Sequence, residues 1–208
     1  MTINSSLKQY IEREILPLYL HFDKAHSSDH AEQVIEQSLK LAEHYDVDID
    51  MVYTIAAYHD TGLCKGREHH HTVSAEIVGA DSTLRQFFTP AQIATIQEAV
   101  IDHRASSKHE PRTIYGRIVA EADRCIDPIT VIRRTIQYGL KHYPEMSKEQ
   151  HAERCLEHLI EKYGREGYLK LWIPHSDNAT KLEQLRVLID NREQLMDIFD
   201  TIYEQQRQ

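Results

Sequence analysis

The chain is expected to fold as an all-α protein, and three observations lead to this expectation. It contains only seven Gly and six Pro among 208 residues, so residues that form tight turns between strands are scarce. Apolar residues recur along most of the chain with the 3.6-residue period of a helix. No two segments of alternating polarity joined by a short turn, the pattern of a β-hairpin, stand out.

The N-terminal half is expected to form five helices. They are predicted at about 5–20, 28–45, 48–60, 70–80 and 89–103. Ser28 or Asp29 is a suitable N-cap for the second helix. The third is apolar along almost its whole length, so we expect it to be buried, and Gly62 follows its end. Pro90 suits the first turn of the fifth helix.

The C-terminal half is expected to form four more helices. They are predicted at about 114–125, 128–143, 147–164 and 177–205. Pro128 opens one of them, and Ser147 with Gln150 has the spacing of a capping box. Residues 164–176 are irregular and contain Trp172, the only tryptophan. We interpret residues 1–143 as the main domain and residues 144–208 as a helical extension packed on it.

Composition and charge exclude several classes of protein. The net charge of −9 disfavours a nucleic-acid binder, although residues 101–141 hold eight Lys and Arg against five Asp and Glu. That stretch could face an anionic ligand. No run of about 18 apolar residues and no signal peptide are present, so neither a membrane span nor export is expected. Three cysteines without a CxxC pair favour a cytoplasmic location.

Histidine is the unusual component of this sequence. The chain contains fourteen histidines, which raises the expectation of metal or acid–base chemistry. The strongest local signal is His59-Asp60, at the end of the apolar third helix. A buried aspartate is costly unless it is paired or binds a metal ion. The neighbouring histidine could bind the same ion.

Further candidate ligands lie at the ends or inner sides of other predicted helices. These are His30, His70, His103 and Asp123. With His59 and Asp60 they offer four imidazoles and two carboxylates, a set suited to Mn, Fe, Co, Ni or Zn. Six ligands suit two divalent ions better than one. No GxSxG, P-loop or GxGxxG motif is present, which disfavours a serine hydrolase or a nucleotide-binding loop.

The segments DKAHSSDHAEQV, AAYHDTGL, HHTVSAEIV, AVIDHRAS and IVAEADR follow one another in an order similar to that of the HD-domain metal-dependent phosphohydrolases. The resemblance covers about residues 20–130 and implies an HD-domain helical bundle. It assigns His30, His59, Asp60 and Asp123 as metal ligands. Two further ligands, found in two-metal members, map to His70 and His103. His69 and His71 remain alternatives to His70.

The resemblance also implies a mechanism in which a water between two metal ions attacks phosphorus. Asp60 would bridge the ions, with His59 among the catalytic residues. Lys65 and Arg104 are also expected to be catalytic. The cations expected to hold the substrate are Arg104, Lys65, Arg67, Lys108 and Arg124. The implied substrate is a small phosphorylated molecule, with a nucleotide favoured. No GYP tripeptide is present, which disfavours a cyclic di-GMP phosphodiesterase.

Two other functions are kept open by the sequence. Some HD-fold proteins use the same ligands in a di-iron oxygenase, and a third reading is a non-catalytic, metal-dependent nucleotide sensor. The basic residues around 101–141 favour a phosphate ligand over an uncharged one. We expect no membrane partner and no stable nucleic-acid complex, and we consider a homodimer as the oligomeric state.

Overall fold

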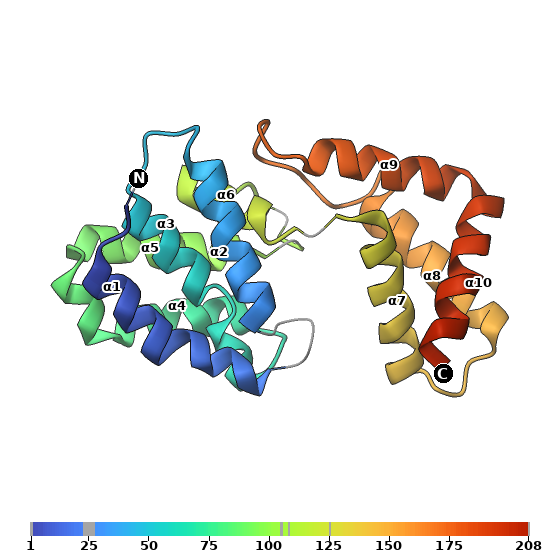
Figure 1. Cartoon of the computed structure of the whole chain (residues 1–208), viewed down its shortest axis with the longest axis horizontal. Helices are drawn as coiled ribbons and strands as arrows, with labels where there is room; N and C mark the ends of the chain where they lie inside the picture. Colours follow the sequence, from blue (N-terminus) through green and yellow to red (C-terminus); the bar gives the residue numbers. More distant parts are fainter. Residues whose placement is uncertain (1, 23–27, 105, 108, 125, 208) are drawn as a thin grey trace. The chain divides into compact units, whose positions relative to one another are not determined.

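The computed structural model describes residues 2–22, 28–104, 106–107, 109–124 and 126–207. These residues form ten α-helices and no strand, so the all-α prediction is confirmed. The chain divides into two compact units, seen as the two groups of helices in Figure 1. The first unit comprises Met1–Arg124 and Trp172–Ser176, and the second comprises Cys125–Leu171 and Asp177–Gln208.

The first unit contains six of the α-helices. They are α1 (Ser5–Tyr10), α2 (Ser28–Ala42), α3 (Ile49–Tyr58), α4 (His70–Ala80), α5 (Pro90–Asp102) and α6 (Ile114–Ala122). A π-helical turn (Ile11–Ile15) and a 3₁₀ turn (Leu16–His21) continue α1, and two further 3₁₀ turns cover Thr61–Lys65 and Ser82–Gln86. Every residue from Met51 to Tyr58 is buried, as the apolar pattern predicts. Helices α2, α5 and α6 pack around this central α3, and α4 packs on α5.

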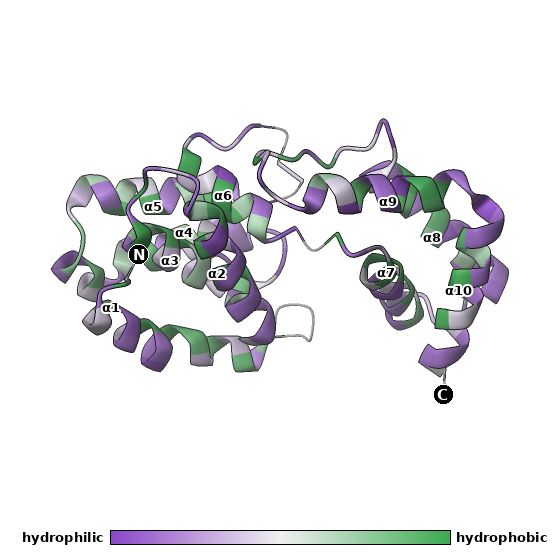
Figure 2. Cartoon of the chain, turned by 45° about the horizontal axis from the view of Figure 1, so that its top comes forward, coloured by the Kyte–Doolittle hydropathy of each residue, from purple (hydrophilic) through white to green (hydrophobic). Residues whose placement is uncertain are grey.

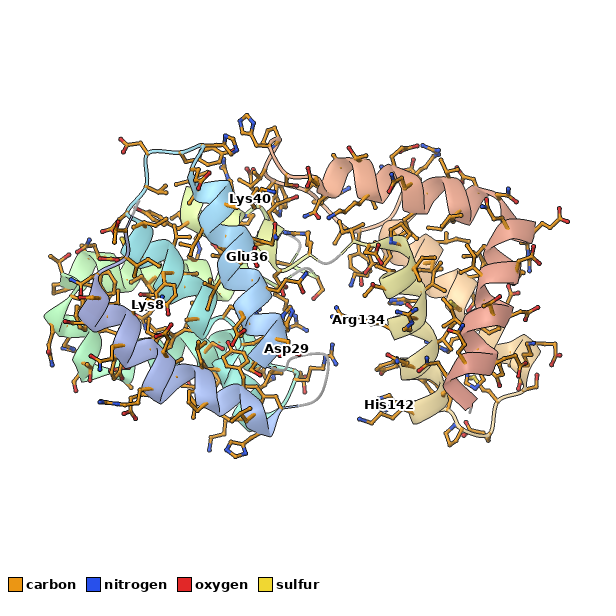
Figure 3. All side chains as sticks on the ribbon, viewed as in Figure 1. Lys8, Asp29, Glu36, Lys40, Arg134 and His142 are labelled. Carbon is orange, nitrogen blue, oxygen red and sulfur yellow. The ribbon has the colours of Figure 1, made fainter. Side chains whose placement is uncertain are left out.

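Helix α2 shows how one amphipathic helix serves both the surface and the interior. His30 and Val34 lie on its buried face. Asp29, Glu36 and Lys40 are exposed, and Figure 3 labels them along the outer side of the helix. The same periodicity that buries the apolar residues therefore also places a histidine inside the first unit.

The second unit contains α7 (Pro128–His142), α8 (Lys148–Tyr163), α9 (Asn178–Asp190) and α10 (Arg192–Arg207). Figure 2 shows hydrophilic and hydrophobic residues on each of α9 and α10. The expectation of one continuous helix over 177–205 is wrong, because the chain turns at Asn191 (φ −99°, ψ 83°). The Asn191 side chain accepts a hydrogen bond from the Gln194 N–H, which caps a new helix instead of continuing the old one.

The chain crosses between the two units more than once. Helix α7, which the sequence assigned to the main domain, belongs to the second unit, whereas Trp172–Ser176 belongs to the first. None of the helices in the described part of the chain has the length and apolar character that a membrane span requires.

Candidate metal centre

Six of the residues singled out in the sequence come from five helices of the first unit. His30 lies in the first turn of α2, His59 is the C-cap of α3 and is followed by Asp60, His70 begins α4, His103 is the C-cap of α5, and Asp123 is the C-cap of α6. His30, His59, Asp60 and His103 are all buried. Five of the six thus sit where a helix begins or ends, and their side chains meet inside the unit.

Three of the histidines are held in the same way by the backbone. The Nδ1–H of His59 donates to the carbonyl of Ala56 (2.7 Å), and that of His103 donates to the carbonyl of Val100 (2.6 Å). The Nδ1–H of His70 donates to the Arg67 carbonyl (2.8 Å). This pattern fixes Nδ1 as the protonated nitrogen of each neutral ring, so Nε2 is the atom of each ring that can bind a cation.

Asp60 lies between two groups of imidazoles. Its Oδ1 is 3.3 Å from His70 Nε2 and 3.4 Å from His103 Nε2. Its Oδ2 is 3.4 Å from His59 Nε2 and 4.0 Å from His30 Nε2. Each carboxylate oxygen therefore faces a different pair of histidines, which is the arrangement of a carboxylate shared by two cations.

Asp123 completes one of the two groups. Its Oδ1 lies 3.0 Å from His30 Nε2 and 3.8 Å from His59 Nε2. We call His30, His59, Asp60 and Asp123 the first metal position. The second metal position consists of Asp60, His70 and His103, whose ligand atoms all lie within 4.8 Å of one another.

Two observations show that the donor atoms fit divalent cations. The buried Nε2 of His59 has no hydrogen-bond partner. The Nε2 atoms of His70 and His103 face each other at 3.3 Å, and because both Nδ1 atoms carry the proton, two lone pairs oppose each other. Two nitrogens each about 2.1 Å from a tetrahedral ion would be roughly 3.4 Å apart. A cation between the rings would relieve this repulsion.

The charges of the cluster also favour a cation. Burial acts to raise the pKa of Asp60, but His59 and His103 hold that pKa well below its usual value. Burial likewise acts to lower the pKa of His59, but Asp60 and Asp123 outweigh it and raise the pKa to about 9. The two carboxylates stay ionised at neutral pH and attract positive charge, whether a proton or a metal ion.

The three consecutive histidines have different surroundings. His70 is the one whose Nε2 faces Asp60. His69 is exposed, and its Nε2 lies 3.6 Å from the Glu68 carboxylate. His71 is half-buried and lines a cavity of about 640 Å³ together with Arg104 and other polar residues.

The cations proposed from the sequence occupy different environments. Arg104 donates to the Glu68 carbonyl (2.9 Å) and reaches the cavity. Lys65 and Arg67 are exposed in the segment between Asp60 and His70. Arg124 is 8 % exposed, and its guanidinium donates to the Ala120 carbonyl in the preceding turn. Lys108 lies outside the described residues.

Tyr19, which lies beside the histidine–aspartate cluster, was not predicted from the sequence. This fully buried tyrosine donates to the Ala57 carbonyl (3.0 Å) and accepts from the Asp60 N–H (3.2 Å). Its ring centroid is 6.2 Å from that of His59. In the sequence Tyr19 is one apolar residue among several in a helical stretch, so nothing distinguishes it from ordinary core.

The HD domain family model matches residues 28–126. A search of curated proteins and a search of solved structures each found no match. The matched range contains all six residues of the two metal positions, and HD domains are all-α. The family match and the histidine–aspartate cluster together identify residues 28–126 of this chain as an HD domain.

Proposed function

We propose that this chain is a metal-dependent hydrolase that cleaves a phosphoester or phosphoanhydride bond of a small phosphorylated molecule, with a nucleotide as the favoured class. The observation that carries the proposal is the position of Asp60, whose two oxygens face two separate groups of histidines. A carboxylate shared in this way supports two cations close together, an arrangement that suits displacement at phosphorus.

Each of the two metal positions would hold one ion. His30, His59 and Asp123 would hold one ion and His70 and His103 the other, with Asp60 on both. Divalent metal ions, when bound there, would activate water and neutralise charge on phosphoryl oxygens. The backbone carbonyls that accept from the Nδ1 atoms hold the three rings with Nε2 facing the metal positions. The ligands would therefore need little reorganisation when the substrate binds.

The residues beside the second metal position are the candidates for substrate binding. Arg104 combines a fixed backbone contact with access to the cavity, so it is the leading candidate to bind a phosphate. Lys65 and Arg67 are exposed in the segment that joins Asp60 to His70 and would supply further positive charge. None of the six residues of the metal positions lines the cavity of about 640 Å³, but His71, Asp102 and Arg104, the chain neighbours of His70 and His103, do, so we propose it as the place of the leaving group. Hydrolysis adds OH to phosphorus and a proton to that oxygen.

The proposal is tested by hydrolysis with chelator-stripped protein reloaded with Mn²⁺ or Fe²⁺. The substrates are mononucleotides, nucleoside triphosphates, dinucleoside polyphosphates, cyclic dinucleotides and a bis-aryl phosphodiester. Asp60→Ala is the inactive variant. Asp29→Ala is the matched control, because it removes an exposed carboxylate from α2 beside His30.

The expected result is turnover of at least one substrate by the wild-type chain and by Asp29→Ala, and none by Asp60→Ala. Equal turnover by Asp60→Ala would contradict the site. Two bound ions with no turnover of any substrate would contradict the hydrolase. In that case, O₂ consumption by the iron form would indicate an oxygenase, and tight nucleotide binding would indicate a sensor.

A further inference from the structure

Glu121 is a buried carboxylate that the metal positions do not use. Its exposed fraction is 0 %, although it lies in the last turn of α6, two residues before Asp123. An acidic side chain there lies at the negative end of the helix dipole, so it does not stabilise the helix. A buried carboxylate persists only where hydrogen bonds or positive charge compensate it.

Hydrogen bonds to Glu121 come from a distant part of the sequence. The Trp172 N–H donates to Oε2 (2.7 Å), and the Ser176 hydroxyl donates to Oε1 (2.5 Å). We call the segment Trp172–Ser176 the strap. The strap belongs to the first compact unit, although the residues on either side of it belong to the second. It lies outside the matched HD-domain range.

The strap is also held by apolar and aromatic contacts. Ile173 is 4 % exposed and packs with a small group of buried residues. That group consists of Leu41 and Ala42 of α2, Val52 of α3 and Ile118 of α6. His175 stacks on His44, just after α2, with ring centroids 4.5 Å apart. The strap thus packs on the three helices that carry His30, His59 and Asp123.

We propose that the strap holds the ligands of the first metal position in place. Glu121 and Ser176 are the positioning residues, because they fix the end of α6 and therefore Asp123. This inference rests on the metal centre of the proposed function. His70 and His103, which belong to the second metal position alone, do not depend on the strap by the same reasoning, because α4 and α5 are absent from the packing group around Ile173. Asp60 is common to both positions, so the difference between them rests on their histidines and Asp123.

Two changes should weaken the first metal position to different degrees. Ser176→Ala removes one hydrogen bond to the Glu121 carboxylate. It should weaken Mn²⁺ binding about 10-fold, the lower end of the range for groups bonded directly to metal ligands, because Ser176 acts through Glu121. Glu121→Gln keeps an acceptor for the Trp172 N–H, and its NH2 can donate to the Ser176 oxygen, so it should weaken binding less than Ser176→Ala does. Ser176→Thr keeps the hydroxyl and should restore binding.

The test measures Mn²⁺ binding to the full chain by electron paramagnetic resonance in two backgrounds. His70→Ala removes a ligand of the second position, and His30→Ala removes a ligand of the first. Ser176→Ala should weaken binding about 10-fold in the His70→Ala background and leave it unchanged in the His30→Ala background. In the otherwise wild-type chain, it should shift one of two binding steps.

A general loss of stability would act on both backgrounds alike. Leu84→Ala serves as the control for that effect, since Leu84 is fully buried in the main core and lies apart from the strap. Equal weakening by Ser176→Ala in both backgrounds, or no weakening in either, would overturn the inference. A wild-type chain that binds no Mn²⁺ would instead overturn the metal centre itself.

Discussion

Gly62 lies where the 3₁₀ turn after Asp60 meets the first turns of α4, and replacing it with alanine should damage one metal position selectively. A Cβ at this residue would lie 2.0 Å from the His70 carbonyl oxygen and 2.5 Å from the Ser74 nitrogen. Real Cβ contacts stay above 3.0 Å, and both neighbours are backbone atoms. The start of α4 must therefore retreat by about 1 Å.

This retreat acts directly on His70, the first residue of α4. Its Nε2 lies 3.3 Å from Asp60 Oδ1, and metal–ligand distances tolerate changes of only about 0.2 Å. Gly62→Ala should lose the ion of the second metal position and retain that of the first. Overpacking of this kind costs about 1–3 kcal/mol of unfolding free energy, or a fall in melting temperature of roughly 2–12 °C for a chain of this size.

The assay is the number of Mn²⁺ ions bound per chain, measured beside the melting temperature. Gly79→Ala is the matched control, because it lies on the same helix. A Cβ there would meet the end of the Gln97 side chain at 2.4 Å, which can turn away, although the Gln97 bond to the Ala75 carbonyl would be lost. Gly79→Ala should bind two ions. Two tightly bound ions in Gly62→Ala would show that the start of α4 does not have to move away from residue 62.

Three further predictions concern buried groups of both units. Tyr19→Phe should lower the unfolding free energy by about 1–3 kcal/mol, because the buried Asp60 N–H loses its acceptor; denaturant unfolding measures this. Burial raises the pKa of Cys155 to about 12, so iodoacetamide at pH 8 should label the exposed Cys64 and spare Cys155, as read by peptide mass spectrometry. Burial lowers the pKa of His151, so the unfolded chain takes up a proton, and the melting temperature should fall as pH drops below about 6.5.

Each of these predictions has an outcome that would contradict it. Unchanged stability in Tyr19→Phe would mean that its hydroxyl does not support the Asp60 backbone. Equal labelling of Cys155 and Cys64 in the native protein would contradict the burial of Cys155. His151→Gln should reduce the dependence of the melting temperature on pH, and an unaltered dependence would show that other groups cause it.

Much of the fold was predictable because its signals are local. The apolar run that ends at His59 predicts the buried α3. Pro90 lies in the first turn of α5, and Ser147 begins α8 with a capping box, both as expected. The break at Asn191 was missed, because the apolar period continues across it while the side chain caps a new helix. Local periodicity does not reveal which of two permitted hydrogen-bond patterns the backbone adopts.

The metal-ligand residues of the candidate site could be predicted from the sequence, but the residues that hold those ligands in place could not. His59 and Asp60 stand out because they end an apolar helix, where a buried aspartate is costly, whereas His30 is assigned through the resemblance to HD-domain proteins. Tyr19 and Glu121 do not stand out, since their roles depend on partners 41 and 51 residues away in sequence. Such long-range contacts arise from packing, which a helical pattern in a single sequence does not encode.

The proposed function depends above all on Asp60 holding two ions in one centre. Electron paramagnetic resonance of the Mn²⁺-loaded wild-type chain tests it most directly, because ions sharing a carboxylate couple magnetically. We expect two Mn²⁺ per chain and a coupled signal that disappears in Asp60→Ala. One ion per chain, or two ions with the signal of isolated Mn²⁺, would contradict it.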